Sequence, residues 1–142
     1  METSIFWPVI TLVGLTGCIW VLMYVRRISE IWRARIDPQS LATSDMASNI
    51  LKDVSAADNF SNLLEAPVLF YAICLILFVT GEVTQLQLVL AWLYVALRAL
   101  HSLIHVTYNG VVHRWAIYTF STICLFIMWG NFTITLLVQN GA

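Results

Sequence analysis

Long apolar runs separated by polar stretches dominate the chain. The first run covers about residues 5–26 and ends at the pair Arg26-Arg27. Three more cover about residues 57–80, 84–107 and 113–138. Each reaches the length of about 20 residues that an α-helix needs to cross the hydrocarbon core of a bilayer. The pattern therefore predicts four transmembrane helices.

The polar stretches predict how these helices are joined. Residues 27–56 form one long connection, within which Asp37-Pro38 should stop any helical continuation of the first span. Gly81-Glu82 and Tyr108-Asn109-Gly110 are turn signals that leave the other two connections short. Pro67 lies inside the second span and should kink that helix. Because short connections favour antiparallel neighbours, we expect an all-α integral membrane protein built as a four-transmembrane-helix antiparallel bundle.

The composition agrees with a membrane protein. The chain has 142 residues, of which 60% are hydrophobic and 11% charged, whereas a soluble domain carries about 25% charged residues. The net charge of −1 creates no field that would attract nucleic acid. Cys18, Cys74 and Cys124 lie within apolar stretches without metal-ligand spacing, so we interpret them as small core residues. We expect one transmembrane domain over residues 1–142.

The basic residues predict the orientation of the bundle. The first connection carries most of them, namely Arg26, Arg27, Arg33, Arg35 and Lys52. Arg114 flanks the third connection on the same side, and the opposite side has no Lys or Arg. Because cytoplasmic loops are enriched in these residues, both termini should be periplasmic and the first and third connections cytoplasmic. We expect the bacterial inner membrane as the location, with membrane lipids around the bundle.

Polar side chains recur at helical spacing in three of the predicted spans. They form three stripes, each on one helix face: Asp58, Asn62 and Glu65; Arg98, His101, His105 and Tyr108; and Arg114, Tyr118 and Ser121. An arginine at the centre of a membrane helix costs about 2.5–3.5 kcal/mol on insertion scales. Such residues usually face the interior of a bundle, so we expect the stripes to converge on a polar cavity open to the cytoplasm.

The antiparallel arrangement predicts which stripes meet. Seven residues, at about 1.5 Å each, place Glu65 about 10 Å deeper in the membrane than Asp58. The same spacing places Arg98 about 10 Å deeper than His105. Glu65 should thus meet Arg98 near the middle of the membrane, and Asp58 should approach His105 near its surface.

The stripes also have simpler interpretations. Glu65 and Arg98 can be a buried ion pair that only fixes the register of two helices. The tyrosines can belong to the aromatic belt at the membrane interface. His101 and His105, at i and i+4, could hold a metal together with Asp58, but Arg98 would repel the cation. We therefore expect no metal.

One combination of motifs resembles a known family. The pattern Asn62-x-x-Glu65-x-Pro67, followed by Arg98-x-x-His101 and then Arg114, is similar to the MAPEG superfamily. These are membrane-associated proteins of eicosanoid and glutathione metabolism, among them microsomal glutathione transferases, microsomal prostaglandin E synthase and leukotriene synthases. The resemblance covers about residues 5 to 138 and is greatest for an uncharacterised bacterial branch.

The resemblance implies a homotrimer of four-helix subunits, with glutathione bound between adjacent subunits near the cytoplasmic surface. By position, the candidate ligands of glutathione are polar side chains drawn from all four helices: Arg26, Asn62, Glu65, Arg98, His101, His105, Tyr108 and Tyr118. Arg114 matches the arginine that stabilises the glutathione thiolate and is the candidate catalytic residue. His105 stands where prostaglandin synthase has a tyrosine.

Two positions depart from the family pattern. Glutathione-binding members commonly place an arginine four residues before the asparagine, where this chain has Asp58. Some also have arginine directly before the asparagine, where this chain has Ser61. Glutathione carries two carboxylates, and each charge-assisted hydrogen bond to such a group contributes about 1.5–3 kcal/mol. Losing two cations and gaining an anion therefore disfavours glutathione binding.

Two functions stay open at this point. The first is a glutathione-dependent transferase or peroxidase that acts on a lipophilic substrate through a thiolate stabilised by Arg114. The second is a non-catalytic membrane binding protein, or an accessory subunit of a larger membrane complex, that has lost glutathione binding. Arg114 with Tyr118 favours the first function, and Asp58 favours the second.

The orientation is testable by labelling. A cysteine introduced at Ser44 should react from the cytoplasmic side, and one at Gly141 from the opposite side, because the basic residues between positions 26 and 52 hold the first connection inside. A membrane-impermeant maleimide applied to intact cells and to inverted vesicles measures both, with the native cysteines replaced by alanine. Labelling of the two positions from the same side would contradict this topology.

Overall fold

The computed structural model describes residues 2–51 and 54–141, and every regular element in these residues is a helix. Two are short 3-10 helices and six are α-helices. In chain order they are η1 (Glu2–Ile5), α1 (Phe6–Ala34), η2 (Pro38–Leu41), α2 (Ser44–Ile50), α3 (Ser55–Glu65), α4 (Pro67–Thr80), α5 (Gln85–Val106) and α6 (Val111–Asn140).

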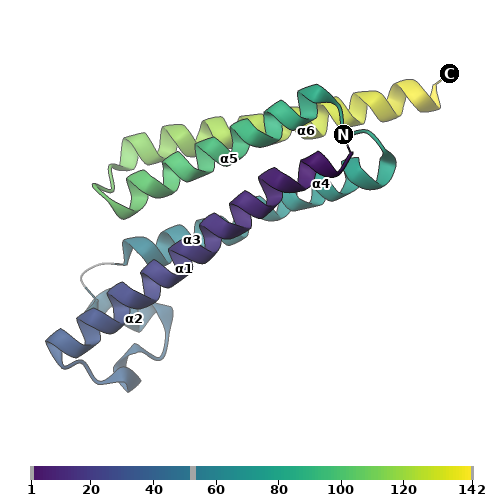
Figure 1. The fold of residues 1–142 in the computed structure, drawn as a ribbon. Coiled ribbons are helices and arrows are strands. Elements are labelled where there is room, and N and C mark those ends of the chain that lie inside the picture. The colour runs from purple at the N-terminus through teal and green to yellow at the C-terminus, as the bar shows by residue number, and fades with distance from the viewer. Residues whose placement is uncertain (1, 52–53, 142) are drawn as a thin grey trace.

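Four stretches are long and apolar enough to cross a membrane. They are Thr3–Ala34, Ser55–Thr80, Gln85–Val106 and Val111–Gln139, so α3 and α4 together make the second span. The spans run back and forth beside one another, with both chain ends at one end of the bundle and α2 at the other (Figure 1). This confirms the predicted all-α membrane fold with four long helices.

The breaks between helices follow from single residues. Pro67 has no backbone N–H, so α3 ends at Glu65 and a new helix begins with the proline in its first turn. Gly81 ends α4 with φ 73°, a left-handed conformation that glycine adopts without steric cost, and its N–H bonds back to the last turn. The tight turn at Gly81 lets the second and third spans lie antiparallel (Figure 1).

The first connection folds back on α1. This helix continues to Ala34, well past the end of the apolar run, and Arg35 then adopts a left-handed conformation with φ 52°. The Asp37 side chain accepts a hydrogen bond from the Gln39 N–H (3.0 Å), and the Thr43 hydroxyl accepts one from Met46 N–H (3.2 Å). Apolar residues of this connection form a small cluster with the end of α1: Leu41, Ala47, Leu51, Ile31, Ile36 and Val54.

The bundle has an apolar core and an apolar exterior. Phe70 of α4 stacks on Tyr94 of α5 with ring centroids 4.6 Å apart, and both side chains are buried. Large apolar side chains also cover the outward faces: Val13, Trp20, Leu75, Val79, Phe126 and Ile134 are all exposed. In water such a surface would be an aggregation liability, whereas lipid chains can cover it at no hydrophobic cost.

Gln87 joins α5 to α6 at the end of the bundle opposite α2. Its side chain is buried, and its Nε2 donates to the Met128 carbonyl at 3.0 Å and to Asn131 Oδ1 at 3.1 Å. Interhelical hydrogen bonds within membrane proteins contribute on the order of 1 kcal/mol each. These two bonds therefore help to set the register of α5 and α6.

We expect Gln87→Leu to lower the free energy of unfolding by about 1–2 kcal/mol, because it removes both bonds to α6. The matched control is Gln85→Leu, two residues away on the exposed side of the same helix. That change should cost less than about 0.5 kcal/mol. Unfolding in detergent micelles, followed by tryptophan fluorescence, compares the two. Equal destabilisation would mean that the α5–α6 bonds have no net effect.

Candidate functional site

The polar face of α5 is enclosed by the other helices. Arg98, His101, Ser102 and His105 are all buried, although they belong to a helix whose opposite face is apolar. They lie at i, i+3, i+4 and i+7, which places them on one side of the helix. This side of α5 faces α3 and α6, which supply most of the partners described below.

Arg98 is the most deeply enclosed charge in the described part of the chain. Its guanidinium donates from Nη2 to the Asn62 carbonyl at 2.7 Å and lies over the Tyr118 ring, 5.3 Å from the ring centroid. Nε and Nη1 are buried without a hydrogen-bond partner among the described residues. Burying an ion in protein costs several kcal/mol unless charges or hydrogen bonds compensate for it. The guanidinium is therefore only partly satisfied by its own chain.

Glu65 forms no direct ion pair with Arg98 among the described residues, although its carboxylate lies close enough to favour the guanidinium electrostatically, so the predicted contact is not a direct one. Glu65 is the last residue of α3 and its side chain is exposed. The inward face of α3 is carried by Ser55, Asn59 and Leu63, which are buried. Each of these positions is offset by about one residue from the predicted stripe. On an α-helix this offset corresponds to a rotation of about 100° around the helix axis. Arg98 consequently meets a backbone carbonyl of α3 in place of a carboxylate.

Asn59 is a site residue that the stripe pattern did not identify. It is fully buried, its Oδ1 accepts a hydrogen bond from the Ser102 hydroxyl at 3.2 Å, and its Nδ2 has no partner among the described residues. Asn59 lies four residues after Ser55 and four residues before Leu63, which places all three on one helix face. This spacing could have identified Asn59 from the sequence. Together with the Arg98–Asn62 bond, this contact aligns α3 against α5 over one helical turn.

The two histidines face α6 and differ in tautomer. His101 Nδ1 lies 3.1 Å from the Arg114 carbonyl, so this nitrogen must donate. His105 Nδ1 lies 3.3 Å from Arg114 Nη1, which is itself a donor, so this nitrogen must accept. Both Nε2 atoms are buried without a partner in the described part of the chain. His105 thus contacts Arg114, and Asp58 also lies close enough to act on His105 electrostatically, in line with the predicted approach of these two residues.

Arg114 is held by the turn that precedes it. Its Nη1 donates to Asn109 Oδ1 at 2.6 Å and lies beside His105. Asn109 adopts a left-handed conformation with φ 51°, which asparagine tolerates better than most residues. The sequence marked Asn109 only as a turn residue, but the turn aims its side chain at the candidate catalytic arginine.

A cavity of about 230 Å³ opens between α3, α5 and α6 beside these groups. It is lined by Asn62, His101, Val111, Arg114, Trp115 and Tyr118. The His101 and Tyr118 rings stand with centroids 5.7 Å apart. Pockets that enclose drug-sized ligands span roughly 300–1,000 Å³. One chain therefore provides a polar recess and not an enclosed site for a tripeptide.

Two predicted site residues lie away from this cavity. Tyr108 is exposed and its hydroxyl contacts His113 Nδ1 at 3.0 Å. Because α5 ends at Val106, Tyr108 no longer follows the helical face on which its spacing placed it. Arg26 donates from Nη1 to the Ser55 hydroxyl at 3.2 Å and from Nη2 to the Val106 carbonyl at 2.8 Å. It thereby joins α1 to the start of α3 and the end of α5.

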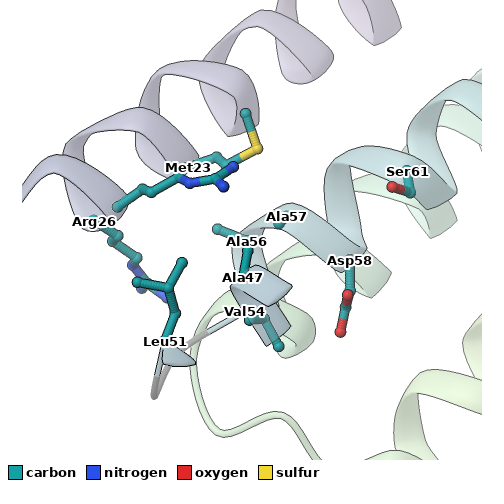
Figure 2. Close-up of a pocket in the computed structure, with 10 residues that line it drawn as sticks. Met23, Arg26, Ala47, Leu51, Val54, Ala56, Ala57, Asp58 and Ser61 are labelled. Carbon is teal, nitrogen blue, oxygen red and sulfur yellow. The ribbon is translucent and has the colours of Figure 1, made fainter. Parts of the chain in front are cut away.

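A second cavity, of about 140 Å³, lies on the other flank of α3. Met23, Arg26 and Arg27 on α1 and Asp58 and Ser61 on α3 line this space, and in Figure 2 the Asp58 carboxylate points away from Met23. Both departures from the family pattern, Asp58 and Ser61, therefore lie beside the arginines of α1. Neither lines the cavity that contains Arg114.

No group of three or more His, Cys, Asp or Glu side chains is arranged to hold a metal ion in residues 2–51 and 54–141. His101 and His105 each contact Arg114 through Nδ1.

Comparison with known proteins identifies the family. A model described as the MAPEG family matches residues 5–133. The chain belongs to the MAPEG family. No curated protein and no solved structure was found to match it. MAPEG proteins are membrane proteins that are often trimeric and commonly bind glutathione, so this chain is an integral membrane protein with four candidate spans.

The role of Arg26 in this MAPEG chain can be measured. We expect Arg26→Gln to lower the free energy of unfolding by about 2–3 kcal/mol, because two hydrogen bonds from a charged donor are lost. Arg33→Gln, on an exposed position of the same helix, is the control and should change stability by less than about 0.5 kcal/mol. Thermal unfolding in detergent distinguishes them. An Arg26 variant as stable as the control would mean that these two hydrogen bonds have no net effect on stability.

Proposed function

We propose that this MAPEG protein is a glutathione-dependent transferase or peroxidase that acts on a lipophilic substrate, with Arg114 as the catalytic residue. The observation that carries the proposal is the polar recess between α3, α5 and α6, in which Arg114 is held by Asn109 and His105. Glutathione would supply the thiol that attacks the substrate. The lipophilic substrate would enter sideways from the bilayer, because the outer face of the bundle is apolar.

Arg114 is suited to stabilising a thiolate. A free thiol has a pKa of about 8.5, so only a small fraction is ionised at neutral pH. A cation beside the sulfur stabilises the thiolate and raises that fraction. Both observed contacts of the Arg114 side chain use Nη1. The Arg114 guanidinium has further N–H groups, which are available to donate hydrogen bonds to a ligand in the recess.

The cationic groups around the recess favour an anionic ligand. Arg98 lies against Asn62 and Tyr118, two of the lining residues, and keeps unsatisfied donors. Asp58 and Ser61 line the other cavity, but the Asp58 charge still acts on His105, which contacts Arg114, so Asp58 opposes the binding of an anion. His101 and Tyr118, across from one another, would bound the thiol from two sides.

A homotrimer would complete the site. The recess of about 230 Å³ is smaller than a pocket for a ligand the size of glutathione. A neighbouring subunit placed over Val111 and Trp115, which are exposed, would add the missing wall. We propose that this side of the membrane is cytoplasmic, where glutathione is the main thiol pool.

The alternative is a non-catalytic membrane binding protein or an accessory subunit of a larger membrane complex. One observation favours it. Asp58 and Ser61 stand where glutathione-binding members have cations, and the loss of even one charge-assisted bond reduces affinity about tenfold or more. In this case the buried polar groups of α5 would serve only to fix the packing of α3 and α6.

Glutathione binding and Arg114 chemistry separate the two functions. Millimolar glutathione should raise the melting temperature of the purified protein, since a ligand at 100 times its Kd adds about 2.7 kcal/mol to the stability of the native state. Arg114→Ala should abolish transfer to a hydrophobic electrophile at neutral pH. Activity should partly return above about pH 8.5, where the thiol ionises without help.

The controls use the same chain. S-methylglutathione should stabilise the wild-type protein but support no reaction, because its sulfur cannot ionise. Arg33→Ala removes an exposed arginine outside the recess and should leave activity unchanged. If glutathione does not stabilise the folded wild-type protein and no transfer occurs, the non-catalytic function is correct.

A further inference from the structure

The end of α1 reaches beyond the rest of the membrane-spanning bundle. Arg26 donates to the Ser55 hydroxyl and to the Val106 carbonyl, which lie at the ends of the second and third candidate spans. The level of Arg26 therefore marks this end of the bundle. Helix α1 continues to Ala34, about 12 Å further at 1.5 Å per residue. Its last two turns thus lie level with the lipid headgroups, which form a layer about 5–8 Å thick on each side of the hydrocarbon core.

The two sides of this segment of α1 differ. On one side, Ile31 packs against the small apolar cluster that the first connection forms with the end of the helix. On the other side, Val25, Ile28 and Trp32 follow one another at helical spacing, and their side chains are 57%, 50% and 79% exposed. Trp32 is the most exposed large apolar side chain in the part of the chain that the structure describes. Tryptophan at this depth is typical of the aromatic belt, whose rings lie among the headgroups.

Arg35 ends this outward stripe, three residues after Trp32, and its side chain is exposed. Its backbone has φ 52°, and the N–H groups of Arg35 and Ile36 both donate to the Ile31 carbonyl. Glycine is the usual residue in this left-handed position at a helix end, because any side chain is less favourable there. An arginine held in such a conformation suggests a role for its side chain.

The charge on the outward stripe is positive. Glu30, two residues after Ile28, falls on the opposite side of the helix. Asp37 lies beyond the helix, and its Oδ1 already accepts a hydrogen bond from the Gln39 N–H. The stripe therefore combines apolar and aromatic side chains with one guanidinium, a group that matches the geometry of phosphate oxygens. A ligand that fits this surface is apolar at one end and carries a phosphate at the other.

We propose that this outward stripe of α1, from Val25 to Arg35, binds the headgroup of an anionic phospholipid such as phosphatidylglycerol. The Trp32 indole N–H and the Arg35 guanidinium donate to phosphate oxygens, Ile28 lies beside the glycerol and ester groups, and Val25 contacts the acyl chains. Phosphatidylcholine fits less well, because the arginine repels its quaternary ammonium group. A basic residue beside an anionic membrane surface favours the anionic lipid about fivefold. The bound lipid holds the first connection at the membrane surface.

Lipid binding to the delipidated full-length protein, measured by native mass spectrometry in mild detergent, tests this. The wild-type protein should bind phosphatidylglycerol about fivefold more tightly than phosphatidylcholine. Arg35→Gly should abolish this preference without unfolding the helix end, because glycine adopts the left-handed conformation without strain. Arg33→Gln is the matched control, since Arg33 is exposed but lies about 140° around the helix from Ile28, and it should keep the preference. Equal affinity of the wild type for both lipids, or an unchanged preference in Arg35→Gly, would overturn the site.

Cysteine reactivity locates the bound lipid. With the native cysteines replaced by alanine, Ile28→Cys should react with a water-soluble maleimide several times more slowly in phosphatidylglycerol vesicles than in phosphatidylcholine vesicles, whereas Arg33→Cys should react alike in both. Slow reaction of Ile28→Cys in detergent without lipid would mean that a second copy of the chain covers this face. Protection by free glycerol phosphate would mean that the ligand is a soluble anion. Either result would overturn the lipid assignment, and none of these measurements depends on glutathione.

Discussion

A charged guanidinium that cannot reach water constrains the whole structure. Arg98 lies in a helix that crosses the membrane, and its side chain is fully enclosed. Lipid can neither hydrogen-bond it nor screen it, so the protein must supply the partners. The Asn62 carbonyl and the Tyr118 ring do so from two different helices. The positions of α3 and α6 around α5 follow from this requirement more than from any single apolar contact.

The polar groups that surround Arg98 also give the recess its shape. His101 and His105 both bond to Arg114, one to its backbone and one to its side chain. Arg114 in turn is bonded to Asn109, which is held in a left-handed conformation by the turn. The same hydrogen bonds that close α5 onto α6 thus orient the group that would act on a thiol. These hydrogen bonds therefore both stabilise the packing of the helices and hold the Arg114 side chain in position.

Helix α3 separates two polar spaces with different electrostatic character. The recess on the α5–α6 side is cationic, through Arg114 with Arg98 behind it. The cavity on the α1 side combines arginine with the carboxylate of Asp58. The two residues that depart from the family pattern both line the α1-flank cavity, but the Asp58 charge acts on His105, so the two spaces are electrostatically coupled.

Patterns along the chain were sufficient to establish the fold, because the thickness of the bilayer sets the length of each span and each apolar run can be counted directly. The four spans, the kink at Pro67 and the turn at Gly81 were all predictable for this reason. The family followed from a few spacings that survive any change in packing.

The contacts inside the bundle were not predictable in the same way. A rotation of α3 by about 100°, one residue, decides whether Glu65 or Asn59 faces α5, and this rotation depends on how all the helices pack together. Sequence spacing identified the stripe of Asp58, Asn62 and Glu65, but packing turned the neighbouring face inward. Likewise Tyr108 left its stripe because α5 ends two residues earlier, and Arg26 became a link between helices because two partners from distant parts of the chain lie within its reach. Periodicity specifies which residues share a face, but the direction of that face is a property of the assembled helices.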